Sequence, residues 1–129
     1  MSKQLIFIGT YKILPYNFEI FMAANEEMSE FVQDHEPQMI SWQTFINDQK
    51  NEATTIMIFP NSTALEYHFE AANRRISHGQ QVVKVQQVEL FGDPGPRVLE
   101  ALQAMSEKGG SWPVIVKNFL HGFPIPHND

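Results

Sequence analysis

The chain has no cysteine among its 129 residues. Disulfides, thiolate nucleophiles, cysteine-ligated zinc and iron–sulfur clusters are therefore excluded, because each of them needs a cysteine sulfur. Basic residues are also few, nine against fifteen acidic ones, and the formal net charge is −6. A chain of this charge, with its basic residues scattered, would repel a phosphate backbone, so we expect no nucleic-acid partner.

Long hydrophobic runs are missing as well. No apolar stretch approaches the roughly 20 residues that a helix needs to cross a bilayer. Residues 1–8 lack the charged start, the long apolar stretch and the small-residue cleavage site of a signal peptide. We expect a protein of the cytoplasm that does not enter a membrane.

The composition is that of a folded domain. Hydrophobic residues make up 43% of the chain and charged residues 19%, and ten phenylalanines supply large side chains for a core. A chain of this length has room for one domain and not for two. We expect residues 1–129 to form a single domain, with 93–129 as a C-terminal extension.

Strand and helix patterns alternate along the first part of the chain. Residues 4–13 open with four successive apolar positions, which is typical of a strand covered on both faces. A helix is predicted over 18–35, with Asn17 as its N-cap and Pro37 just beyond its end. Its predicted inner stripe is Phe18, Phe21, Met22, Met28 and Val32.

The second part of the chain repeats this alternation. The predicted elements are a hairpin of strands 39–47 and 53–59, a helix 62–77 with capping side chains at 61–63, a strand 82–91, a helix 97–108 and a short strand 113–119. The tail that follows has enough apolar residues to dock somewhere.

The order of elements predicts an α+β fold of the ferredoxin-like type. Strand, helix, two strands, helix and strand form the split β-α-β pattern, to which this chain adds a C-terminal helix and strand. Helices then cover one face of the sheet, while strands that are apolar on both faces need a second cover. Another subunit's sheet is the simplest cover, so we expect a homodimer.

Several short strings resemble the antibiotic biosynthesis monooxygenase superfamily. They are Glu36-Pro37 followed by a strand with an aromatic residue near its start, Phe59-Pro60-Asn61 leading into the segment 64–68, Val88 to Gly92, Val114 to Val116, and His121-Gly122-Phe123. The last three resemble a subgroup with an extra C-terminal helix and strand. The resemblance implies a dimeric α/β barrel in which two sheets face each other, with a pocket between sheet and helices in each protomer.

Five residues are candidates for that pocket. His68 is predicted on or near the inner stripe of the second helix, as a general base or as a core histidine bonded to a neighbour. Trp42 is predicted to wall the pocket or only to fill the core. Tyr11, Tyr67 and Asn25 are further substrate-binding candidates, although Tyr11 also fits a dimer interface, Tyr67 a helix flank and Asn25 a hydrogen bond inside the fold.

Three functions stay open on these residues. The first is a cofactor-independent monooxygenase acting on an aromatic or quinone-type molecule, with His68 as base and no metal or cofactor. The second is a small-ligand-binding or stress-related protein without catalysis. Haem binding ranks below both. The haem-degrading relatives pair their helix histidine with an asparagine on the first strand and a tryptophan on the third, whereas the first strand predicted here has no asparagine and the strand 53–59 has no tryptophan.

Overall fold

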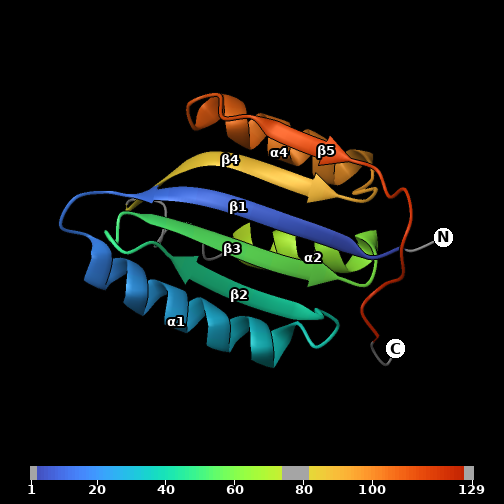
Figure 1. Cartoon of the computed structure of the whole chain (residues 1–129), viewed down its shortest axis with the longest axis horizontal. Coiled ribbons are helices and arrows are strands. Elements are labelled where there is room, and N and C mark those ends of the chain that lie inside the picture. Colours follow the sequence, from blue (N-terminus) through green and yellow to red (C-terminus); the bar gives the residue numbers. More distant parts are fainter. Residues whose placement is uncertain (1–2, 74–81, 127–129) are drawn as a thin grey trace.

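A five-stranded sheet with helices on one side makes up the computed structural model, which describes residues 3–73 and 82–126 (Figure 1). The strands are β1 (Leu5–Ile13), β2 (Ser41–Ile46), β3 (Glu52–Phe59), β4 (Val83–Phe91) and β5 (Val114–Lys117), and the helices are α1 (Phe18–His35), α2 (Ser62–Asn73) and α4 (Pro96–Lys108). The strand order is β2-β3-β1-β4-β5, with only the β4–β5 pair parallel.

This arrangement confirms the predicted ferredoxin-like fold with an added helix and strand. The ends of the predicted strands and of the first and third helices lie within two residues of the observed ones. The predicted end of the second helix, at residue 77, lies outside the described residues. In Figure 1, α2 and α4 lie behind the sheet and α1 runs along its β2 edge, so no helix covers the face of the sheet that is turned to the viewer.

The core lies between the sheet and the helices because strand side chains alternate between the two faces. On β1 and β3 the odd-numbered residues point to the helices, and all of them are buried except Tyr11, which is half-buried. The buried core consists of Leu5, Phe7, Met57, Phe59, Ala64, Leu65, Val88, Leu90, Val98, Leu102 and Trp112. Helix α4 contributes Val98 and Leu102 to this core.

Two details of α1 differ from the prediction. Asn17 makes no side-chain capping bond, because its amide nitrogen donates instead to the carbonyl oxygen of Pro15, 3.0 Å away. Met22 is exposed, because it lies one residue beyond Phe21 and therefore about 100° further round the helix. The inner side of α1 includes Asn25 and the predicted Val32, and only Val32 is buried.

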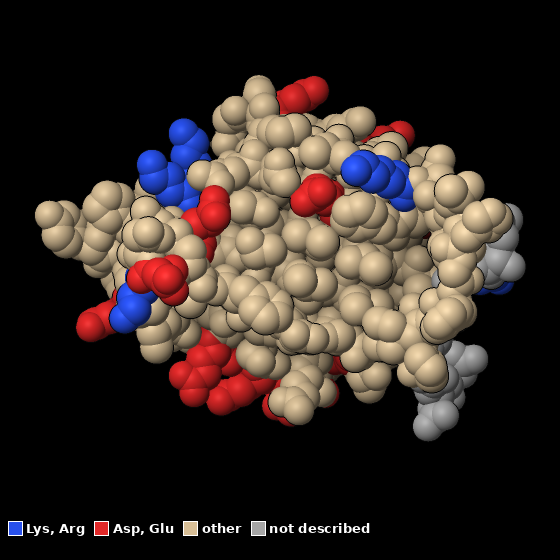
Figure 2. Space-filling model, in the orientation of Figure 1, with Lys and Arg blue, Asp and Glu red and all other residues tan. Residues whose placement is uncertain are grey.

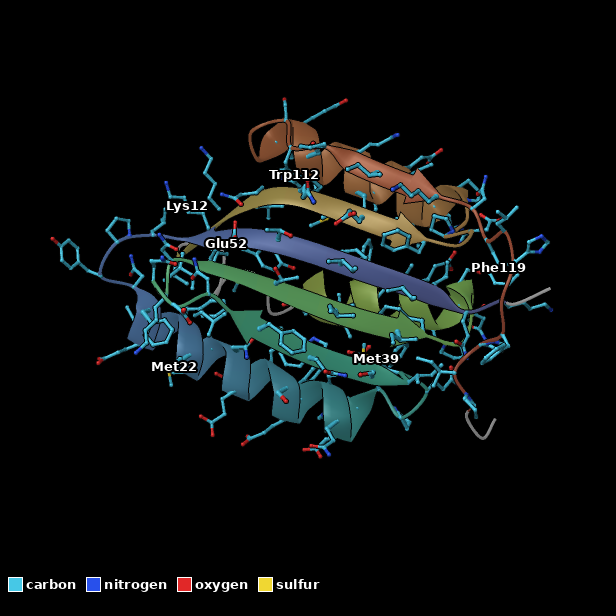
Figure 3. The ribbon with its side chains drawn as sticks, viewed as in Figure 1. Lys12, Met22, Met39, Glu52, Trp112 and Phe119 are labelled. Atoms are coloured by element: carbon cyan, nitrogen blue, oxygen red, sulfur yellow. The ribbon has the colours of Figure 1, made fainter. Side chains whose placement is uncertain are left out.

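The face of the sheet opposite the helices has an apolar half and a charged end. At one end Ile6 pairs with Ile58 and Ile8 with Ile56, and all four side chains face away from the helices. At the other end Lys12 is the register partner of both Glu52 and Lys84. Figure 2 shows this face, and Figure 3 labels Lys12 and Glu52 on it. The first strand is therefore apolar on both faces in this half, as predicted, and its second cover stays a prediction.

Among the described residues, no helix is both long and apolar enough to cross a bilayer.

Candidate functional site

His68 lies on the inner side of α2 and is buried, with 6% of its surface exposed. The helix begins where Asn61 accepts a hydrogen bond from the backbone N–H of Ala64, at 2.9 Å, which confirms the predicted capping segment. From that start, Leu65 and His68 are three residues apart and face the sheet together. The imidazole ring lies 5.6 Å from the ring of Phe59 on β3.

Glu36 holds His68 from the carboxyl end of α1. The Nδ1 atom of His68 lies 2.8 and 2.9 Å from the two carboxylate oxygens of Glu36, which is 5% exposed. Because an ionised carboxylate only accepts hydrogen bonds, Nδ1 must be the donor. In a neutral imidazole the unprotonated nitrogen is then Nε2. Among the described residues, none takes part in a hydrogen bond with Nε2.

Glu36 is not among the site residues predicted from the sequence. A signal for it existed, because Glu36 follows the last residue of α1, where a negative charge is unfavourable next to the negative end of the helix dipole. A glutamate at such a position needs a cationic or hydrogen-bonding partner. The predicted inward histidine on the next helix supplies that partner.

Tyr11 faces the helices from β1 and lies over Gly9 of the same strand. A β-carbon at position 9 would collide with the ring and the hydroxyl oxygen of Tyr11, so glycine is required for this placement. The register against β4 shifts beside Tyr11, leaving Gln86 as the extra residue of a β-bulge. Burial raises the pKa of Tyr11 to about 12, and a hydrogen bond with Thr55 acts in the opposite direction.

A chain of hydroxyl groups connects Tyr11 with Asn25. Thr55, which is bonded to Tyr11, lies 3.2 Å from the hydroxyl of Thr44, and Thr44 donates to the side-chain oxygen of Asn25 at 3.0 Å. Each hydroxyl has one proton, so the protons run in one direction, from Tyr11 towards Asn25. If the Asn25 side-chain amide turned over so that its nitrogen donates to Thr44, each of these hydrogen bonds would reverse its direction. Tyr11 would then accept from Thr55, and its own hydroxyl proton would be free to donate to another group.

Trp42 lies on β2 between the histidine pair and the hydroxyl chain. It is the register partner of Met57 and packs partly buried against the core, on the same face of β2 as Thr44. Phe59, beside His68, and Thr55 are four residues apart on β3, which corresponds to about 13 Å of strand. The structure therefore brings four of the five predicted residues to the helix side of the sheet, in two polar groups with Trp42 between them.

Tyr67 is the predicted residue that lies elsewhere. Its side chain is exposed on the flank of α2, and its hydroxyl donates to the backbone oxygen of His35 at 3.3 Å. The tyrosine therefore ties α2 to the end of α1 and does not point into the space beneath the helices.

The other histidines form no site in the described part of the chain. His35 bonds to the backbone oxygen of Phe31 through Nδ1, and His121 is exposed. His78 and His127 are outside the described residues. Within residues 3–73 and 82–126, no group of three side chains is arranged to hold a metal ion.

Helix α1 buries fewer of its residues than α4, with Val32 as its single buried residue. In α4 the inner residues Val98, Leu102 and Ser106 are buried. On the α1 side, by contrast, partial accessibility remains at Phe21, Asn25, Met28, Tyr11 and Trp42. A separate recess of about 340 Å³ involves none of these residues, because it is lined by Gln103, Ser106, Glu107, Trp112 and Val114.

No family model matches the chain, and no curated protein matches it. Solved structures do match. MupZ from Pseudomonas fluorescens has a TM-score of 0.75 and 14% identity, over 96% of both chains. SnoaB from Streptomyces nogalater, a cofactor-independent oxygenase, has a TM-score of 0.62 and 10% identity, over 71% of this chain and 94% of its own. An antibiotic biosynthesis monooxygenase has a TM-score of 0.56 and 20% identity, over 67% of this chain and 92% of its own.

The matched structures differ in how much of this chain they cover, and the difference bears on α4 and β5. A match over 96% of this chain must include α4 and β5, which together span residues 96–117, so MupZ shares them. The shorter matches leave about a third of the chain uncovered. At these identities the likeness concerns the fold alone. The chain has the fold of the antibiotic biosynthesis monooxygenases, as the sequence resemblance implied.

Proposed function

We propose that this protein is a cofactor-independent oxygenase that acts on an aromatic or quinone-type molecule. The observation that supports the proposal most directly is the buried His68–Glu36 pair, which lies on the same side of the sheet as the half-buried side chains of Tyr11 and Trp42. A fold shared with a cofactor-independent oxygenase is consistent with it. Such an enzyme needs a base, a polar anchor and a site that excludes water.

His68 is the proposed base. With Nδ1 donating to Glu36, Nε2 is the atom that takes a proton from the substrate. The imidazolium that forms is then stabilised by the Glu36 carboxylate, in the way that a buried aspartate serves a catalytic histidine. Glu36 also fixes the ring orientation, so its role is that of a positioning residue.

Tyr11 and Trp42 are the proposed substrate contacts. Because the pKa of Tyr11 is raised to about 12, its hydroxyl stays protonated at neutral pH. An anionic substrate oxygen beside Tyr11 favours the arrangement of hydrogen bonds in which Asn25 is the donor to Thr44. In that arrangement the hydroxyl proton of Tyr11 is available to the substrate. The indole of Trp42 supplies a flat apolar wall for an aromatic ring.

The proposed reaction takes its electrons from the substrate. A substrate with an acidic CH2 group between aromatic rings loses one proton to His68. The resulting anion reduces molecular oxygen and combines with it to give a peroxide anion, which takes the proton back from His68. Loss of water from the peroxide leaves a carbonyl group. One oxygen atom is then in the product and the other in water. The two broken C–H bonds have supplied two protons, which end in the water, and four electrons, which reduce both atoms of molecular oxygen.

Oxygen consumption tests the proposal. Wild-type protein is mixed with a panel of quinols and anthrone-like compounds in an oxygen electrode and compared with His68→Asn. If His68 is a general base, uptake on an accepted compound falls by about 100-fold or more in the variant. His35→Asn, at an exposed histidine on α1, is the matched control and should keep full activity. Absence of uptake on every compound overturns the proposal.

A second candidate function is ligand binding without catalysis. The specific observation in its favour is that the His68–Glu36 bond also ties α2 to the end of α1, which by itself accounts for a buried histidine. Calorimetric titration with the same panel separates the two functions. Binding without oxygen uptake favours the second, and binding with uptake favours the first.

We also propose that the protein is a homodimer with the two sheets facing each other. The apolar half of the uncovered face supports this, since Ile6, Ile8, Ile56 and Ile58 form two register pairs side by side. Covering such a surface removes apolar area from water at about 25 cal/mol per Å². No helix of the described chain lies over it (Figure 1).

A further inference from the structure

The C-terminal tail, residues 118–126, carries several large apolar side chains that are exposed in the protomer. Leu120 is 81% exposed and Phe123 94% exposed, and Phe119 and Ile125 also keep more than a third of their surface accessible. Large apolar side chains are rarely left so open without a partner when several occur together. The sequence predicted that the tail docks on some surface, and within the described chain Leu120 and Phe123 are not buried against any surface.

The tail is nevertheless held in a definite position. Gln4 pairs with Ile125 through two hydrogen bonds, its Nε2 donating to the backbone oxygen at 2.6 Å and its Oε1 accepting from the backbone N–H at 3.0 Å. The side-chain amide thus pairs with the tail as a neighbouring strand would. Pro124 and Pro126 further restrict the backbone, which lowers the conformational entropy lost on docking.

The position of the tail is the rim of the uncovered sheet face. Its start is fixed where the Gly92 N–H donates to the oxygen of Lys117, at the end of β4 and β5. Its far end is fixed at Gln4, beside the start of β1. Figure 1 shows the tail crossing that end of the sheet, and Figure 3 labels Phe119 there. This is the end at which Ile6 and Ile58 make the face apolar.

From this placement we infer that the tail is an arm that binds a second copy of this chain, with Leu120 and Phe123 as its anchors. The inference rests on the proposed face-to-face dimer and names a part of its interface. The arm has no charged residue, so it matches an apolar surface and not an ionic one. It continues directly from the apolar half of the sheet face, and two-fold symmetry would place one arm at each end of the interface.

Sedimentation equilibrium tests the inference with the full-length chain. The double variant Leu120→Ser/Phe123→Ser leaves the protomer fold intact, because both side chains are exposed in it. We expect its dimer dissociation constant to rise by about tenfold or more. Tyr16→Ser is the matched control, since Tyr16 is a fully exposed aromatic residue that is far from the tail in sequence. This substitution should leave the dimer dissociation constant unchanged. An unchanged constant in the double variant overturns the arm.

A sheet-face variant separates this inference from the dimer itself. If Ile56→Lys dissociates the dimer and the tail variant does not, the face-to-face dimer stands and the arm is wrong. If only the tail variant dissociates it, the arm stands and the face-to-face arrangement is wrong. A wild-type chain that is monomeric at all concentrations overturns both.

Thiol labelling provides an independent readout. The chain has no cysteine, so a single introduced thiol is the only one that reacts. Phe123→Cys should react with a maleimide more slowly as the protein concentration rises through the dimerisation range. Tyr16→Cys should react at the same rate throughout. Equal, concentration-independent rates for the two thiols contradict the arm.

Discussion

The imidazole of His68 and the carboxylate of Glu36 meet across 32 positions of sequence, with Nδ1 2.8 Å from one oxygen and 2.9 Å from the other. Both side chains are buried, so removing one leaves the other without a partner away from water. We expect Glu36→Ala to lower the free energy of unfolding by about 3–5 kcal/mol, measured by urea denaturation.

Glu30→Ala is the control for that measurement, because it removes an exposed glutamate from the same helix. Its effect should stay within about 0.5 kcal/mol. Equal effects of the two substitutions would mean that the buried pair does not hold α1 to α2.

Tyr11 should ionise late. Its pKa is raised from the ordinary 10 to about 12, because burial disfavours the phenolate. The ultraviolet titration of tyrosinate should therefore contain a step near pH 12 that is missing in Tyr11→Phe. A circular dichroism spectrum at each pH confirms that the protein is still folded, and identical titrations of the two proteins would show that Tyr11 is not buried in this way.

The same shift makes stability depend on pH. A phenol whose pKa is higher in the folded state than in the unfolded state stabilises the fold fully below pH 10, and that contribution is lost as the pH rises from 10 to 12. The wild-type free energy of unfolding should fall more steeply in this window than that of Tyr11→Phe. If the free energy of unfolding fell more steeply with pH in Tyr11→Phe than in the wild type, the raised pKa of Tyr11 would be contradicted.

Gly9 should be intolerant of a side chain because the Tyr11 ring lies on it. We expect Gly9→Ala to cost about 1–3 kcal/mol, the usual cost of overpacking. Most of this cost should vanish in a Tyr11→Ala background, where the ring is gone, and urea denaturation of the four proteins gives the coupling energy. No coupling would mean that the two residues do not contact each other.

The sequence predicted the elements of this fold well because their signals are local. Apolar periodicity and the residues Pro37 and Asn61 mark helix ends within a few positions, so the strand and helix bounds follow. It also placed His68 and Asn25 inward, since helical spacing determines which side a residue faces. Met22 was misplaced by one position around the same helix.

The hydrogen-bonding partners of His68 and Asn25 could not be predicted from the sequence. Glu36 is 32 positions from His68, and Thr44 is 19 positions from Asn25, so their pairing depends on how the helices lie on the sheet. The predicted Asn17 cap failed for a similar reason, since the side chain bonds to Pro15 two residues before it. Such choices among competing hydrogen bonds are decided by three-dimensional geometry.

Thr44 should be the critical link of the hydroxyl chain. Thr44→Val keeps the shape of the side chain but leaves Asn25 and Thr55 without this hydrogen-bonding partner, which costs about 1–3 kcal/mol for buried groups. Thr54→Val, on the opposite face of β3, is the matched control and should have a smaller effect. Urea denaturation compares the two, and a larger effect at Thr54 would contradict the role of the chain.

Ile56 should be the most sensitive position of the proposed sheet interface. It lies on the uncovered face as the register partner of Ile8, so in a face-to-face dimer Ile56→Lys places a charge in a desolvated apolar surface. We expect sedimentation to show a monomer where the wild type is a dimer. Ile20→Lys makes the same substitution at an exposed isoleucine of α1 and should leave the dimer intact. A dimer that survives Ile56→Lys but not Ile20→Lys would place the interface on α1, because only the surface that is buried on association cannot accept a lysine.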